Sequence, residues 1–194
     1  GELEARLGGT LSEPDVVLNV AFGKVVLAGH PVGSIRGGAR ASESQIRFDN
    51  LTIARKGGTV WLNGKMGRQP PHSLGLLVDI GGVRLSQIVS VATGEPAPKW
   101  LRGLAGGRLQ ATGSLDDPVL DFRMAFQDVW VGRQLLKEGG IAGRMRAGTW
   151  HLDLFEARMG SGWIFARGSI SPDLELDLSA YSTGLRAGSF SFLA

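Results

Sequence analysis

The side chains that most often carry catalysis or bind metals are few in this chain and lie far apart. Its three histidines are His30, His72 and His151, and none has a second ligand at the spacing of a zinc finger or a metal-binding helix. His30 precedes a proline and His72 follows two prolines, which favours turns. His151 lies near Asp153, but no Gly-x-Ser-x-Gly motif supplies a nucleophile for such a pair. The histidines therefore predict neither a metal site nor a catalytic base.

Carboxylates and glycine-rich segments give no stronger indication of catalysis or of phosphate binding. Asp116 and Asp117 are adjacent, so their side chains would point apart on a strand, and Pro118 marks a turn directly after them. Segments 139–143 and 160–162 are rich in Gly, but they lack the sequence frame of a phosphate-binding loop before a helix. We therefore expect a protein that is not an enzyme and that binds no metal or cofactor.

The composition is typical of a folded β protein. Hydrophobic residues make up 43% and charged residues 20% of the 194 residues, which is enough apolar surface for a folded domain. The chain has 30 glycines, about twice the usual share of roughly 7%, and they stand at the ends of short apolar runs, as turns and bulges require. Cysteine is absent, which excludes a disulfide framework and a thiolate metal site.

Charge and aromatic residues do not predict a nucleic-acid partner. The chain has 21 Lys and Arg against 18 Asp and Glu, and the basic residues are scattered singly instead of forming the stripe that nucleic acid requires. The tryptophans are spread over both halves of the chain, which favours packing over one base-stacking platform. They are Trp61, Trp100, Trp130, Trp150 and Trp163.

Alternation of apolar and polar residues is the dominant pattern along the chain. Successive side chains of a strand point to opposite faces of its sheet, so these runs predict strands with one apolar face. The residues that we expect on that face are Val16, Leu18, Val20, Phe22, Ile46, Phe48, Val60, Leu62, Met66, Leu76, Val78, Leu120, Phe122, Met124, Phe126, Leu152, Leu154, Ile164, Leu176 and Leu178.

The alternating pattern occurs twice. Pro14 and Pro118 are 104 residues apart, as are Gly64 and Gly168. Each copy predicts a meander of five or six antiparallel strands joined by turns rich in Gly, Asp, Ser and Pro. A repeat in sequence indicates a repeat in architecture, and a surface extended by repetition can carry a function that no single residue carries.

One segment between the two copies departs from the β pattern. Leu85, Ile88, Val89 and Ala92 have helical spacing, and a glycine and a proline follow them. We therefore predict a first meander repeat over 1–83, a helical connector over 84–105 and a second meander repeat over 106–194. We expect the connector to cover the end of the sheet's core; a contact with a partner or a membrane surface is the alternative.

A sheet with one strongly apolar face must cover that face with another layer, with itself or with a ligand. The sequence offers too little helix to form the covering layer. Alternation alone allows both a trough that holds a ligand and a closed β-sandwich, and it does not distinguish them.

Several segments resemble the repeats of AsmA-like and TamB-like bacterial envelope proteins. The resemblance is carried by segments 109–122, 162–170 and 174–179, and more loosely by 9–14 and 60–64 of the first copy. It implies an all-β fold, an elongated antiparallel meander curled into a U-shaped β-taco with an apolar groove. It also implies a non-enzymatic periplasmic protein whose groove conducts phospholipid between the inner and outer membranes, with the twenty residues above contacting acyl chains.

The same resemblance implies where the protein works and with what. The parent protein would be anchored in the inner membrane by a segment absent here, because no apolar run approaches the roughly 18 residues of a spanning helix. It would meet an outer-membrane partner of the BamA or TamA kind through regions outside this chain.

Two other functions are weighed against lipid transport. One is a chaperone of the translocation and assembly module type, which would assist assembly of outer-membrane β-barrels by adding strands at a sheet edge. The other is an extracellular adhesion or sugar-binding domain, which would need an aromatic and carboxylate cluster at one loop end. The sequence shows no such cluster.

Overall fold

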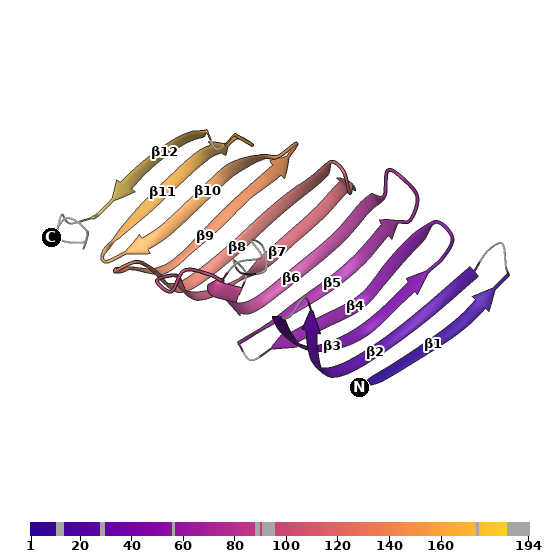
Figure 1. Cartoon of the computed structure of the whole chain (residues 1–194). Coiled ribbons are helices and arrows are strands. Elements are labelled where there is room, and N and C mark those ends of the chain that lie inside the picture. Colours follow the sequence, from indigo (N-terminus) through magenta and orange to yellow (C-terminus); the bar gives the residue numbers. More distant parts are fainter. Residues whose placement is uncertain are drawn as a thin grey trace. The chain divides into compact units, whose positions relative to one another are not determined.

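The chain folds into antiparallel strands joined in chain order (Figure 1). The computed structural model describes residues 1–10, 14–27, 30–55, 57–87, 90, 96–173 and 175–185. Within them the strands are β1 (Glu2–Gly9), β2 (Pro14–Leu27), β3 (His30–Ala41), β4 (Gln45–Arg55), β5 (Gly58–Gly67), β6 (Ser73–Arg84), β7 (Arg102–Ser114), β8 (Pro118–Val131), β9 (Gln134–Arg146), β10 (Thr149–Met159), β11 (Gly162–Ile170) and β12 (Leu176–Thr183).

All twelve described strands belong to one sheet, in which each strand is hydrogen-bonded to its neighbours in sequence. The sheet is not closed into a barrel. The prediction of an all-β antiparallel meander is therefore confirmed, with six strands in each repeat. The strands do not divide into the two sheets that a sandwich would require.

The segment between the repeats is shorter than predicted at both ends. Strand β6 continues to Arg84, residues 85–87 are helical, and β7 already begins at Arg102. Of the residues that carried the helical pattern, Ile88, Val89 and Ala92 lie outside the described part of the chain, as does Leu174 of the last envelope-protein-like segment.

The chain forms two compact units, which do not coincide with the two sequence repeats. The first unit holds Gly1–Ile80 and Leu109–Leu120, and the second holds Gly81–Arg108 and Asp121–Ala194. The boundary crosses β6, β7 and β8, because each of these long strands contributes part of its length to each unit.

The sequence repeat is reproduced strand by strand. Strands β2, β3, β4 and β5 begin at residues 14, 30, 45 and 58, whereas β8, β9, β10 and β11 begin at 118, 134, 149 and 162, a difference of 104 in each case. Register shifts repeat as well. The β4·β5 pairing shifts between Phe48 and Leu51, and the β10·β11 pairing shifts between Leu152 and Phe155.

Local geometry explains why the first of these bulges forms. Asn50 has a φ of 50°, a left-handed conformation that Asn adopts more readily than most residues. Its N–H donates a hydrogen bond to Asn63 Oδ1 at 2.8 Å. The bulge therefore keeps a partner for a backbone group that the ladder would otherwise leave unpaired.

A glycine follows each bulge on the neighbouring strand. Gly64 lies opposite Phe48 with a φ of 127°, and Gly168 lies opposite Leu152 with a φ of 151°. A Cβ atom on Gly64 would lie 2.9 Å from Leu76 Cα, and one on Gly168 would lie 2.8 Å from Leu178 Cα. Only glycine tolerates both this backbone conformation and this close approach of the next strand.

Candidate functional site

Cross-strand partners in a sheet lie on the same face, so the register assigns a face to each side chain. In the first unit Leu18 is paired with Ala39, which is paired with Phe48, which in turn is paired with Gly64. By the same register the predicted residues Val16, Leu18, Val20, Phe22, Ile46, Phe48, Val60, Leu62 and Met66 share one face. We call it the apolar face of the first unit.

Strand β6 continues this face. A Cβ atom on Gly75 would lie 3.7 Å from Lys65 Cγ, so Gly75 is on the side of the Lys65 side chain. Lys65 is paired with Arg47 and therefore lies on the charged face. Leu76 and Val78 alternate with Gly75, which places them on the apolar face, as predicted.

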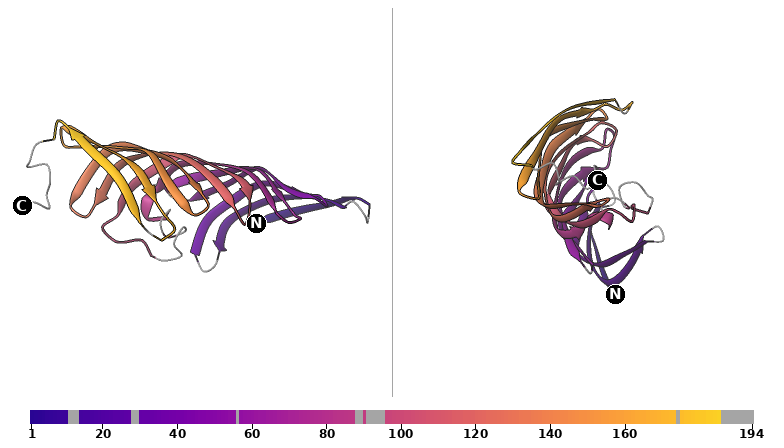
Figure 2. Two further views of the ribbon diagram at one scale, coloured as in Figure 1. Left: turned by 90° about the horizontal axis from the view of Figure 1, so that it is seen from above. Right: turned by 90° about the vertical axis from the view of Figure 1, so that its left-hand side faces the viewer.

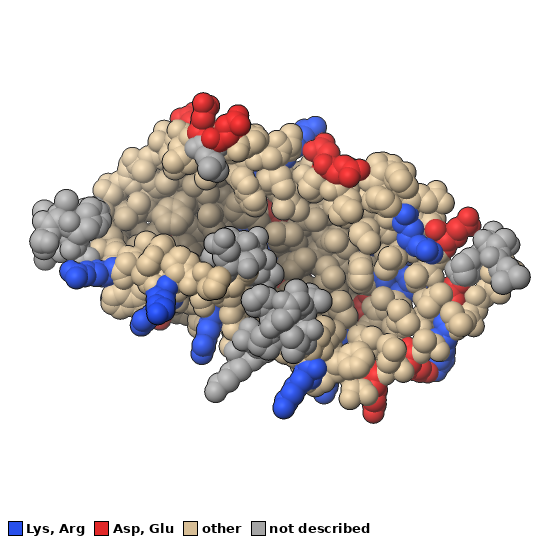
Figure 3. Space-filling model, in the orientation of Figure 1, with Lys and Arg blue, Asp and Glu red and all other residues tan. Residues whose placement is uncertain are grey.

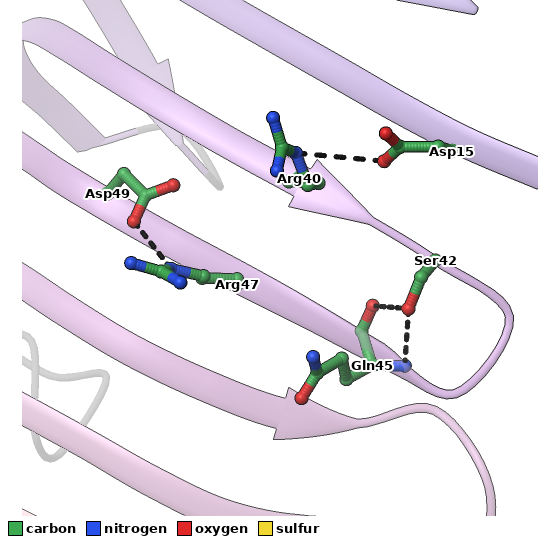
Figure 4. Close-up of polar contacts among 6 residues, drawn as sticks. All are labelled: Asp15, Arg40, Ser42, Gln45, Arg47 and Asp49. Carbon is green, nitrogen blue, oxygen red and sulfur yellow. Dashed lines mark hydrogen bonds and ion pairs between the residues drawn. The ribbon is translucent and has the colours of Figure 1, made fainter. Parts of the chain in front are cut away.

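The opposite face of the first unit carries the charges. Arg47 Nε donates to Asp49 Oδ1 at 2.8 Å, and Arg40 Nε lies 3.7 Å from Asp15 Oδ1 (Figure 4). All four side chains are well exposed, so these ion pairs contribute little to stability. The charged side chains of these ion pairs are thus segregated from the apolar face of the first unit.

The second unit has an apolar face of its own. Leu152 is paired with Gly168, which is paired with Leu178, and Ile170 of the same strand is paired with Leu176. On β8, Phe122, Met124 and Phe126 share a face by alternation, and the rings of Phe122 and Phe126 contact aromatic rings of this face. Among the cross-strand partners that the β9–β12 ladders define on this face, none is charged.

Aromatic rings meet on this face across an intervening strand. Phe126 of β8 stacks with Phe155 of β10 at a centroid distance of 6.0 Å, and Phe122 contacts Trp150 at 5.9 Å. Strand β9 lies between them (Figure 1) and has glycines where the rings cross, at Gly139 and Gly143. The rings therefore extend over the β9 backbone and add a continuous aromatic surface to the apolar face.

Leu154 was predicted on the apolar face, and this prediction is wrong. Leu152 is paired with Gly143, whereas Leu154 is paired with Ala142, so the bulge between them turns Leu154 to the opposite face. Phe155, which the alternation pattern did not select, takes its place opposite Ile141. Leu120 was also predicted on the apolar face, and it belongs to the part of β8 that lies in the first unit. Apart from Leu154, the predicted residues of the second unit lie on its apolar face, including Ile164 opposite Ala157.

The apolar face of the second unit is hollowed. In the left-hand part of Figure 3, where β9–β11 lie in Figure 1, the centre of the visible face carries no charged residue and charges appear at the rim. Both views of Figure 2 show the orange and yellow strands β9–β12 as a single layer. This unit thus presents a shallow apolar groove.

Burial is low for a chain of this length. The described residues include eight that are buried: the apolar residues Val83, Ala105, Ala111, Val129, Ala157 and Met159, and the glycines Gly143 and Gly162. The accessible surface is 12884 Å² for a mass of 20.6 kDa, compared with roughly 8,900 Å² for a compact monomer of this mass. Much apolar sheet surface therefore remains in contact with solvent.

The opposite face of the second unit is polar, with one aromatic cluster. Arg144 Nε donates to Asp121 Oδ1 at 2.6 Å and Arg158 Nη1 donates to Glu138 Oε1 at 2.9 Å. Phe165 stacks between Trp163 and Tyr181, with centroid distances of 6.3 and 5.0 Å. A pocket of about 520 Å³ is lined by apolar residues that include Leu104, Ala125 and Trp163, with Glu138 and Glu156 among its polar residues.

The histidines and carboxylates that were candidates for catalysis or metal binding have ordinary structural environments. His72 Nδ1 lies 3.2 Å from the Gly67 carbonyl oxygen, and the Asp117 N–H donates to Ser114 Oγ at 3.0 Å in the predicted turn. His151 is exposed, and the side chain of His30 lies outside the described part. Within the described residues no group of three His, Cys, Asp or Glu side chains could hold a metal ion.

Comparison of the chain with protein-family models, with curated proteins and with solved structures finds no match. In the described part of the chain, no helix is long and apolar enough to cross a membrane.

Proposed function

We propose that this protein binds the acyl chains of phospholipids on its apolar faces and conducts lipid between the inner and outer membranes of a bacterial envelope. The observation that supports this proposal most directly is a single-layer sheet whose hollowed face carries aliphatic and aromatic side chains, while its charges lie on the other face and at the rim. The sequence resemblance to AsmA-like and TamB-like proteins points to the same function, in the periplasm. It also points to an outer-membrane partner of the BamA or TamA kind.

The energetics explain why such a face would help. Transfer of an acyl chain of about sixteen methylenes from a bilayer into water costs on the order of 13 kcal/mol, at about 0.8 kcal/mol per methylene. An apolar groove removes most of that cost but does not hold the chain more tightly than a bilayer does. A lipid could therefore move along the face with its headgroup in water.

The side chains of the second unit suit this task. Phe122, Phe126, Phe155 and Trp150 supply broad, stiff apolar surface without a charge, and the glycines of β9 keep that surface continuous. Hydrocarbon contact needs no directional hydrogen bond, so a chain could shift along the groove without breaking specific interactions.

Native mass spectrometry of the protein, purified from a bacterial host without detergent, would test this proposal. We expect phospholipid adducts that are lost in a Met124→Glu variant, because the carboxylate would stand on the apolar face unpaired. The matched control is Ala125→Glu on the exposed opposite face of the same strand, which should keep its lipid. Both variants must show native far-UV circular dichroism; lipid-free wild-type protein, or equal adducts in both variants, would refute the proposal.

A second candidate function is a chaperone that pairs nascent outer-membrane barrel strands with an open sheet edge. All residues of β1 and β12 are exposed, and these strands are the outermost of the described sheet. Chaperone activity would act through backbone hydrogen bonds at these edges. It should therefore survive Met124→Glu in an assay of barrel folding into vesicles, whereas lipid binding should not.

A further inference from the structure

The pocket on the polar face of the second unit lies mainly on strands β7–β11, and all of its lining residues belong to this unit. On β7 and β8 it is lined by the small residues Gly106 and Ala125, and also by the longer side chains of Leu104 and Gln127. Residues two apart on a strand share a face. The small residues therefore leave a depression that the longer side chains border.

Glu156 supplies this pocket with a carboxylate that has no counter-ion. Glu156 and Arg158 share a face of β10, but Arg158 Nη1 donates to Glu138 Oε1 at 2.9 Å. Among the described residues the Glu156 side chain has no hydrogen-bond or ion-pair partner. A Cβ atom on Gly140 would lie 3.5 Å from Glu156 Oε1, so the carboxylate extends over the β9 backbone. The described lining residues include no Lys or Arg, which leaves the pocket with a net negative charge.

An aromatic ring borders the same pocket. Trp163 is one of the lining residues, and it belongs to the row of rings in which Phe165 stacks between Trp163 and Tyr181. Of these three rings only Trp163 lines the pocket. The stack holds the indole in place, so little conformational freedom is lost when a ligand binds against it. An indole attracts a cation that lies over its face.

We propose that this pocket binds a small organic ammonium ion, which donates its N–H groups to Glu156 and places its apolar body against Leu104 and Trp163. A carboxylate and an indole in one pocket suit such a cation, because a charge-assisted hydrogen bond and a cation–π contact act on the same group. The amide of Gln127 adds a hydrogen-bond acceptor without a charge.

The ligand is a soluble amine and not the headgroup of a lipid held in the groove, because the sheet separates the pocket from the apolar face. The inference is therefore independent of lipid binding.

Titration of the whole chain with phenethylammonium, followed by the indole N–H signals in proton–nitrogen NMR spectra, tests the proposal. We expect the Trp163 signal, assigned with a Trp163→Phe variant, to shift and saturate. The signal of Trp150, which lies on the apolar face, should stay in place. Phenethyl alcohol has nearly the same shape but no charge, so it should bind at least about tenfold more weakly.

A charge-neutral variant tests the role of the carboxylate. Glu156→Gln keeps the shape of the side chain, so it should weaken phenethylammonium binding at least about tenfold and leave phenethyl alcohol binding unchanged. Glu175→Gln is the matched control, because it removes the same charge from an exposed side chain of the same unit outside the pocket. It should bind both ligands as the wild-type protein does.

Three results would overturn the proposal. The first is equal affinity of the wild-type protein for the two ligands, which needs no variant and so does not depend on the folding of Glu156→Gln. The second is unchanged phenethylammonium binding by a Glu156→Gln variant with native far-UV circular dichroism. The third is a titration in which the Trp163 signal does not move, whether or not the Trp150 signal shifts.

Discussion

Phe126 and Phe155 stack with their ring centroids 6.0 Å apart although they lie on strands that are not neighbours. Strand β9 separates them, and Gly139 of β9 is paired with Ala157 on the same face. Because Gly139 has no side chain, the Phe126 ring can lie over the β9 backbone and reach β10. The aromatic surface of the second unit therefore depends on a residue that contributes no apolar side chain.

This relationship predicts a large effect of a small substitution. A Cβ atom on Gly139 would overlap the Phe126 ring and the Glu156 carbonyl oxygen, so we expect Gly139→Ala to lower the free energy of unfolding by about 1–3 kcal/mol. Gly140→Ala is the matched control, because its Cβ would meet no atom closer than 3.5 Å. Urea denaturation of both variants measures the difference, and equal midpoints would contradict the prediction.

The bulge in β10 predicts opposite effects of charge at two adjacent residues. Phe155 lies on the apolar face and Leu154 on the polar face, where it is 41% exposed. Phe155→Glu should therefore abolish lipid adducts in native mass spectrometry, whereas Leu154→Glu should retain them. Uninterrupted alternation from Leu152 would predict the reverse result.

Most of the fold could be predicted from alternation and the internal repeat. The pairs of residues 104 apart anticipated strands that begin 104 apart, and all predicted apolar residues of β2–β5 share a face. These features are local in sequence, because a strand's faces follow from its own period of two.

The bulge in β10, and the faces of the residues that follow it, could not be predicted from alternation and the internal repeat. Alternation from Leu152 selects Leu154, but Leu154 and Phe155 are adjacent apolar residues that cannot both lie on one face of a regular strand. That doublet was the available signal, and it does not say which residue faces inward. The ring contacts across β9 and the unit boundary within β6–β8 depend on pairing between distant segments, which one sequence does not specify.

Glu4 predicts a local pH effect at the edge strand. Hydrogen bonds from Arg6 and then Asn19, together with the charge of Arg6, lower the pKa of the exposed Glu4 carboxyl below its usual 4.5. Because the folded pKa is the lower one, the small stabilisation is present above 4.5 and is lost as the pH falls through the folded pKa. NMR titration should show this lowered pKa, and Arg6→Gln should raise it; an unchanged midpoint would contradict the role of Arg6.

The burial of Met159 predicts that the sheet is especially sensitive to loss of packing at this residue. Its side chain is 1% exposed at the end of β10, whereas Leu176 of the same unit is 66% exposed on β12. Met159→Ala removes buried methylenes and leaves a cavity, so we expect a loss of about 2–5 kcal/mol. Leu176→Ala removes contacts that are mostly with water and should cost well under about 1 kcal/mol. If chemical denaturation shows similar losses for the two variants, the β12 side of the apolar face is covered and the groove of this unit is not open.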